Sequence, residues 1–121
     1  GLYFGWADQG DRTVLTDPTA DSVINGRETL CVQDRYNYDV DDKITAIHTC
    51  LDNSRAADDT FFLNFTSTSG SGAVGHPKEY AKDINLDLYA YEWEAGKAYG
   101  VVIVDFGPKK IAEKIYGTNF Q

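Results

Sequence analysis

Two aspartates follow strand-like runs, in positions where a carboxylate can take part in chemistry. Asp34 ends the first run and has Tyr36 two residues later, whereas Asp105 ends an almost wholly apolar run and precedes Phe106. A carboxylate at the carboxyl end of a buried parallel strand points into the crevice in which α/β proteins bind ligands. An aspartate that caps the following helix would give a similar pattern, so both interpretations are open at this point.

The surrounding sequence predicts three βα units in residues 28–121, after an irregular lead-in over residues 1–27 that holds at most a short strand at 13–15. The expected strands cover residues 29–34, 60–66 and 99–105. The expected helices run from Asp41 or Asp42 to about residue 58, from Pro77 to about residues 93–95, and from Pro108 through Ile115.

Strands and helices alternate, and the strands are nearly continuous in apolar residues, which favours an α/β fold with parallel strands joined by right-handed crossovers. Three such units leave open sheet edges, so they either form part of an incomplete (β/α)8 TIM-type barrel or pair with another chain. In both arrangements Asp34, residues 64–67 and Asp105 share one rim, because the strands run in the same direction.

The composition limits the classes of partner. The chain has 121 residues, 42% of them hydrophobic, which is enough for one domain with a modest core. Its formal charge of −8 argues against nucleic acid or an anionic membrane held by general electrostatics, since both require a basic face. The sequence contains no methionine, so we expect Gly1 to have been exposed by processing or truncation of a longer chain.

Two cysteines could meet where the first helix packs on the first strand. Cys31 lies in that strand and Cys50 in that helix. A disulfide closing a loop of about twenty residues would contribute roughly 3 kcal/mol in the chain-entropy model. The alternative, two buried thiols, is left open, although the bridge is favoured.

Four short motifs, at residues 32–36, 63–69, 80–85 and 100–106, agree in order and spacing with one known family. Over about residues 30–117 the chain resembles the carboxyl-terminal half of the bacterial-type phosphatidylinositol-specific phospholipases C. The family fold is a distorted (β/α)8 barrel, and the resemblance implies that this chain supplies its last three or four strands. It also implies a secreted protein that acts on phosphatidylinositol or an inositol head group.

The resemblance implies a role for individual residues. Asp34 and Tyr36 match the family motif whose aspartate binds inositol hydroxyls and whose tyrosine stacks on the ring. Asp105 matches the aspartate that orients the general-base histidine, so it is the predicted catalytic residue. Asn64 and Ser67, on the same predicted rim, complete the predicted substrate-binding set.

Other catalytic groups of the family have no counterpart here. The family's two catalytic histidines and its phosphate-binding cation lie on earlier strands, and we expect His48 to pack in a helix and His76 to lie in a solvated loop. The chain is therefore expected to be inactive alone and to need its amino-terminal half or a companion chain. No metal or cofactor is predicted within it, and a peripheral membrane contact is left open.

Two further interpretations remain. The chain could be a non-catalytic half-barrel that binds inositol or sugars through Asp34 and Tyr36, or a degenerate barrel kept as an interaction module. Three aromatic residues near the second helix are expected to pack in the core or on a helix face: Tyr89, Tyr91 and Trp93.

Overall fold

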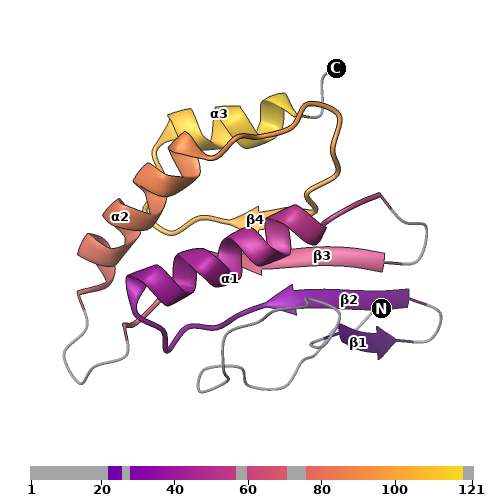
Figure 1. The fold of residues 1–121 in the computed structure, drawn as a ribbon, viewed down its shortest axis with the longest axis horizontal. Helices are drawn as coiled ribbons and strands as arrows, with labels where there is room; N and C mark the ends of the chain where they lie inside the picture. The colour runs from indigo at the N-terminus through magenta and orange to yellow at the C-terminus, as the bar shows by residue number, and fades with distance from the viewer. Residues whose placement is uncertain (1–21, 26–27, 57–59, 71–75, 119–121) are drawn as a thin grey trace.

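The computed structural model describes residues 22–25, 28–56, 60–70 and 76–118. Its strands are β1 (Ser22–Asn25), β2 (Glu28–Gln33), β3 (Thr60–Phe65) and β4 (Val101–Ile103). Its helices are α1 (Val40–Asn53), α2 (Pro77–Ala90) and α3 (Lys109–Gly117). The strands form one sheet in the order β1-β2-β3-β4, in which β2, β3 and β4 are parallel (Figure 1). The predicted α/β fold, with three parallel strands and three helices in alternation, is confirmed.

The strand β1 was not predicted. It pairs antiparallel with β2, from Ser22 opposite Cys31 to Asn25 opposite Glu28, so the expectation of an irregular lead-in is wrong for residues 22–25. The dipeptide Asn25-Gly26 is a hairpin signal that could have indicated this pairing. The short strand expected at residues 13–15 lies outside the described residues.

The N-cap of helix α1 lies two or three residues before the expected caps Asp41 and Asp42. Asp39 is the N-cap, and its Oδ1 accepts a hydrogen bond of 2.8 Å from the backbone N–H of Asp42. Asp41 and Asp42 instead lie in the first turn, where carboxylates stabilise the positive end of the helix dipole. The helix ends at Asn53, before the expected residue 58.

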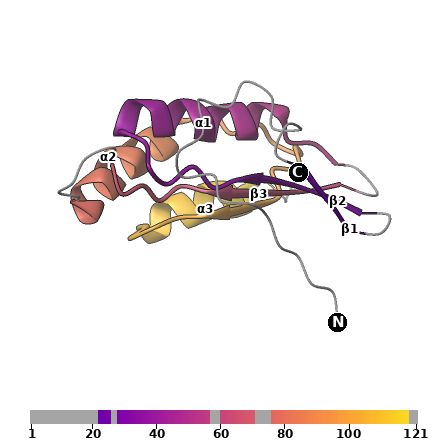
Figure 2. The same cartoon turned by 90° about the horizontal axis from the view of Figure 1, so that it is seen from below.

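The core forms on one side of the sheet. The helix α1 lies across that face of β2 and β3, with α2 beside it and α3 against α2 (Figures 1 and 2). The buried apolar cluster joins all three helices and the segment before β4: Ile47, Leu51, Ile84, Leu88, Tyr99 and Ile111. Within the described residues, no helix is long and apolar enough to cross a membrane.

The strand β4 is shorter than expected because of Gly100. This glycine has φ +76°, and a Cβ at its position would lie 2.3 Å from the carbonyl oxygen of Phe62. The backbone at Gly100 therefore passes against β3 and turns before the regular ladder begins at Val101. The helix α2 also ends early, at Ala90, so Tyr91 and Trp93 leave it and stack edge to face with Tyr99.

The face of the sheet opposite α1 is largely uncovered on β3 and β4. Val102 packs towards the core cluster, whereas its neighbours Val101 and Ile103 are 59% and 41% exposed, and Phe61 on β3 is 52% exposed. Side chains alternate between faces along a strand, which explains this difference between neighbours. In a (β/α)8 barrel the face away from the helices is the packed interior.

The predicted disulfide is not formed. Cys31 and Cys50 are both buried as thiols, 2% and 1% exposed, so the bridge is corrected to the alternative of two thiols. Burial raises the pKa of Cys50 to about 12, and the neighbouring Cys31 adds to this effect. The two side chains fill the layer between β2 and α1, which a pair of buried thiols can do without a covalent link.

Candidate functional site at the carboxyl edge of the sheet

The residues predicted to do chemistry lie just beyond the carboxyl ends of parallel strands. Asp34 follows β2, Ser67 follows β3 and Asp105 follows β4, and all three are half-buried. Because β2, β3 and β4 are parallel and adjacent, these residues share one edge of the sheet. Two strand spacings of about 4.8 Å separate β2 from β4, which leaves roughly 10 Å between the places where Asp34 and Asp105 leave the sheet.

The alternation of side chains along the strands, extended past their ends at Gln33, Phe65 and Ile103, predicts that these residues are on the uncovered face. Gln33 and Asn64 bond to groups of α1, and Val104 packs against the helical core. Asp34 and Asp105 each come one residue later, so they have the opposite phase. The two carboxylates are therefore in phase with the side chains that would face the inside of a barrel.

Arg35, between Asp34 and Tyr36, has both backbone polar groups bound by buried side chains. Its N–H donates to Gln33 Oε1 at 2.9 Å, and its carbonyl accepts from Lys43 Nζ at 2.8 Å. Gln33 itself is wholly buried and donates from Nε2 to Asn64 Oδ1 at 2.6 Å and to the carbonyl of Phe65 at 2.7 Å. The backbone that carries Asp34 and Tyr36 is thus fixed to both β3 and α1.

Tyr36 presents its ring to solvent while its backbone is held by the next loop. The residue is 39% exposed. The Tyr36 carbonyl accepts from the backbone N–H of Ser69 at 2.7 Å, from Ser69 Oγ at 2.9 Å and from Thr68 Oγ1 at 3.1 Å. The loop after β2 and the loop after β3 therefore form one surface beside Ser67. An exposed aromatic face next to hydroxyl and carboxylate groups suits a polyol ring, which has an apolar C–H side and a polar edge.

Asn64 is placed differently from the other predicted substrate-binding residues. It is wholly buried, its Oδ1 accepts from Gln33, and its Nδ2 donates to the carbonyl of Ile47 at 3.2 Å. In this structure it joins β2, β3 and α1 beneath the edge and has no surface to offer a ligand. Its parity with the buried Phe62, two residues earlier on β3, is the sequence signal for this orientation.

Asp105 lies at a tight turn. The carbonyl of Asp105 accepts from Asn85 Nδ2 at 3.1 Å, so α2 holds this end of β4. Phe106 has φ +48° and is 62% exposed. A bulky residue in the left-handed region costs about 1–2 kcal/mol, so the surrounding contacts maintain this turn against strain.

The sequence patterns did not predict a role for Lys43. It lies in the first turn of α1, is wholly buried, and donates to Gln33 Oε1 at 2.9 Å as well as to the carbonyl of Arg35. Burial lowers the pKa of its amine to about 7, partly offset by the nearby carboxylate of Asp34. Its position three residues after Val40 and four before Ile47, on the apolar face of the helix, was the available signal.

The histidines do not join this edge as a catalytic pair. His48 Nε2 lies 2.6 Å from Asp87 Oδ2, and its ring meets Tyr91 edge-on at 5.0 Å between centroids, which confirms the expected helix-packing role. His76 is exposed and precedes α2. Within the described part of the chain, no three His, Cys, Asp or Glu side chains are grouped as metal ligands would be.

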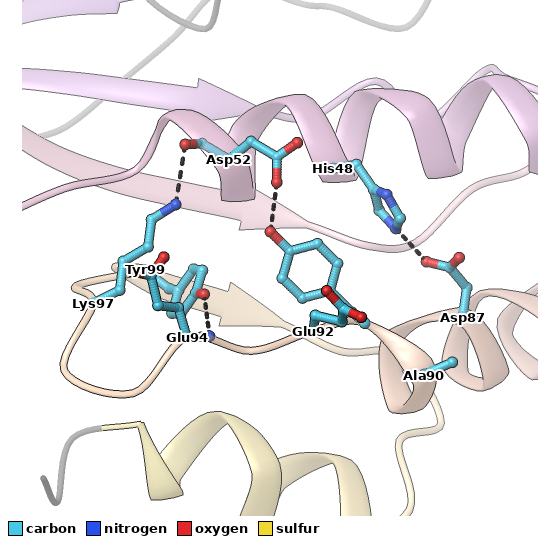
Figure 3. A pocket seen from close by; sticks show the side chains of 9 residues that line it. His48, Asp52, Asp87, Ala90, Glu92, Glu94, Lys97 and Tyr99 are labelled. Atoms are coloured by element: carbon cyan, nitrogen blue, oxygen red, sulfur yellow. Dashed lines mark hydrogen bonds and ion pairs between the residues drawn. The ribbon is translucent and has the colours of Figure 1, made fainter.

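A separate pocket of about 480 Å³ lies between α1, α2 and the segment before β4 (Figure 3). Its polar groups bond to one another: Tyr91 donates to Asp52 Oδ1 at 2.6 Å, and Lys97 Nζ donates to the carbonyl of Asp52 at 3.0 Å. Asp52 is near the carboxyl end of α1, which returns to the amino ends of the strands. This pocket is therefore on the helical side and away from the edge that carries Asp34 and Asp105.

Comparison with known proteins identifies solved structures with a similar fold. Structures of phosphatidylinositol-specific phospholipase C from Staphylococcus aureus match with TM-scores of 0.70 for a substituted variant and 0.72 for a form studied for modulation of its membrane binding, both at 26% identity. A variant containing pentafluoro-phenylalanine matches at 27% identity with a TM-score of 0.71. The chain has the fold of part of a phosphatidylinositol-specific phospholipase C.

These matches cover 96–98% of this chain and 40% of each Staphylococcus aureus chain, so the sequence spans about two fifths of their length. No protein-family model and no curated protein matches the sequence. The resemblance found in the motifs is thus confirmed at the level of fold. The chain has the fold of part of a phospholipase C-like barrel.

Proposed function

We propose that this chain supplies the inositol-recognition wall of a phosphodiesterase that acts on phosphatidylinositol. The observation that carries the proposal is that Asp34 and Tyr36 follow β2 and Asp105 follows β4, two parallel strands on either side of β3, at one edge of a phospholipase C-like fold. An ionised Asp34 can accept hydrogen bonds from two neighbouring hydroxyls of inositol, and the exposed face of Tyr36 can pack on the C–H side of the ring. We also propose that the protein is secreted, on the resemblance alone.

The proposed reaction is an internal displacement at phosphorus. The inositol 2-hydroxyl attacks phosphorus, which forms the new ring P–O bond and breaks the P–O bond to diacylglycerol. The hydroxyl proton passes to a histidine on the remaining part of the barrel, and a second acid protonates the leaving diacylglycerol oxygen. Asp105 would accept the N–H of the first histidine, which fixes its tautomer and stabilises the imidazolium that forms.

The uncovered face of the sheet supports the proposal that this chain needs further strands to complete its barrel. Phe61, Val101 and Ile103 are each more than two fifths exposed on the side that lies inside a closed barrel. The strand β4 is at the end of the described sheet, so its outer edge can accept another strand. We propose that the remaining strands, in the same protein or a companion chain, cover this face and bring the two histidines to the edge.

Reconstitution tests this proposal. The chain is combined with the polypeptide that supplies the remaining strands, and cleavage of phosphatidylinositol to diacylglycerol and a cyclic inositol phosphate is followed. We expect Asp105→Asn to lower kcat by about 10³–10⁴, since a carboxylate that orients a histidine has an effect of that order. Asp83→Asn, on the exposed side of α2, is the matched control and should retain activity. A well-folded assembly that does not cleave phosphatidylinositol would refute the proposal.

A second candidate is inositol binding without catalysis. It is favoured by the hydrogen bonds that hold the loops of Asp34 and Tyr36 within this chain alone. Calorimetry with myo-inositol on the isolated chain distinguishes the two. Binding that is abolished by Asp34→Ala and kept by Asp83→Ala would favour a stand-alone binding module, whereas binding that appears only after addition of the remaining strands would favour the enzyme.

A peripheral contact with a membrane is proposed at a groove of about 630 Å³ between α2 and α3. Its apolar residues Leu86, Tyr89 and Phe106 are 62%, 45% and 62% exposed, and Tyr89 lies on the face of α2 with Lys114 Nζ 4.2 Å from its ring centroid. The groove is bordered by lysines that would favour anionic lipid headgroups: Lys78, Lys82 and Lys110. Sedimentation with vesicles of phosphatidylcholine and phosphatidylglycerol should show binding that Phe106→Ser weakens and high salt reduces. Equal recovery of the wild type and this variant would argue against this surface.

A further inference from the structure

A fully buried lysine lies directly beneath the loop that carries the proposed inositol ligands. Lys43 has no exposed surface, although its amine must lose its hydration to occupy this position. Lysine is rarely buried unless its amine is bonded. Within the described residues, the amine donates to two groups that shape the loop after β2: Gln33 Oε1 at 2.9 Å and the carbonyl of Arg35 at 2.8 Å.

The bonds of Lys43 converge on one residue of that loop. Gln33 Oε1 accepts both from Lys43 and from the Arg35 N–H, while Lys43 also holds the Arg35 carbonyl. Both peptide groups around Arg35 are therefore fixed by the same pair of buried side chains. Asp34 precedes Arg35 and Tyr36 follows it, so the directions of both proposed ligands depend on this arrangement.

We propose that Lys43 is a positioning residue for inositol binding, which acts through Gln33 and the Arg35 backbone to aim Asp34 and Tyr36 into the crevice. Its link to inositol rests on the proposed function, whereas its control of the loop does not. A neutral amine has two N–H donors. Lys43 donates to two acceptors, so the neutral form can make both hydrogen bonds.

The charge of the amine gives the loop a pH dependence that a residue acting only by packing would not produce. Burial lowers the pKa of Lys43 to about 7, and three groups around it contribute further: Asp34 and Cys50 raise this pKa and Arg35 lowers it. Asp34 follows β2 and Cys50 lies in α1. The charge of the amine therefore interacts with ionisable groups on both elements that enclose it. Titration of the amine should therefore be visible in the backbone of the loop.

The experiment uses the ¹⁵N-labelled chain and compares the wild type with Lys43→Met, which keeps the length of the side chain and removes its donors. In the wild type, the amide signals of residues 34–36 should shift with a midpoint of about pH 7, and Lys43→Met should abolish this shift. Hydrogen exchange at the Arg35 and Ser69 amides should accelerate about tenfold or more in the variant, relative to core amides. Lys109→Met, at an exposed lysine of α3, should change neither.

Unchanged titration and exchange in Lys43→Met would overturn the proposal. If this variant does not fold, hydrogen exchange in the wild type decides: an Arg35 amide that exchanges as fast as exposed loop amides overturns the inference. A myo-inositol titration of the same samples should show weaker binding for Lys43→Met by about tenfold or more. Should the wild type bind no inositol while the loop still titrates, the proposed function fails and the control of the loop stands.

Discussion

The buried amine of Lys43 makes the stability of the fold depend on pH in a specific direction. In the unfolded chain its pKa has the ordinary value of 10.5, whereas burial in the fold lowers it to about 7. Between these values the unfolded state binds more protons than the folded state. The free energy of unfolding must therefore rise with pH across this window, and the gain is lost as pH falls towards the folded pKa.

The size of the effect follows from the two pKa values. Each pH unit inside the window contributes up to about 1.4 kcal/mol. From about pH 6 to about pH 8.5, partial protonation of the folded amine near pH 7 reduces the total to about 2 kcal/mol. The raised pKa of Cys50, about 12 against an ordinary 9.0, acts in the opposite direction and only at higher pH. We therefore expect wild type to gain about 2 kcal/mol more than Lys43→Met over this range.

Urea unfolding followed by circular dichroism measures the difference. Wild type, Lys43→Met and the exposed-site control Lys109→Met are unfolded at several pH values, and each midpoint is converted to a free energy of unfolding with a common slope. Every other ionisable group apart from the substituted lysine is the same in the three proteins, so the comparison isolates the effect of Lys43. Parallel pH profiles for wild type and Lys43→Met would refute the reasoning, because they would mean that the amine does not lose its charge in the fold.

Three further outcomes follow from the packing. Gly100→Ala should destabilise the fold by more than about 2 kcal/mol in urea unfolding, because its Cβ would lie 2.3 Å from the Phe62 carbonyl oxygen at a positive φ. Cys31 and Cys50 should resist alkylation in the native chain and gain two adducts by mass spectrometry only after unfolding, so rapid native labelling would contradict their burial. Asp39→Ala should cost about 1 kcal/mol through loss of its helix-capping bond, and no change in thermal midpoint would argue against that cap.

The sequence was sufficient for the parts of the fold that depend on periodicity. The alternation of apolar runs with helical stripes predicted parallel strands, and direction alone then placed Asp34 and Asp105 at one edge. The spacing of Ile47 and Leu51 likewise predicted the buried face of α1. These features are set by local patterns that recur every two or every three to four residues, so they can be read without knowing any contact.

Features that depend on contacts between distant segments could not be predicted from sequence periodicity. The state of Cys31 and Cys50 depends on the relative direction of two side chains across β2 and α1, which spacing does not define. The burial of Lys43 depends on acceptors supplied by Gln33 and Arg35, and charged residues on helices are usually solvated. The turn after β4 depends on Asn85, which donates to its carbonyls from twenty or more residues away.

The most direct test of the account is to find where inositol binds. Myo-inositol is titrated into the ¹⁵N-labelled chain, alone and assembled with the strands that complete the barrel, and the shifted amides are mapped. The account predicts shifts at residues 34–36, 67–69 and 105 that saturate together in the assembled protein and are lost in Asp34→Ala. Saturable shifts centred instead on His48 and Asp87, or none in a completed barrel, would contradict it.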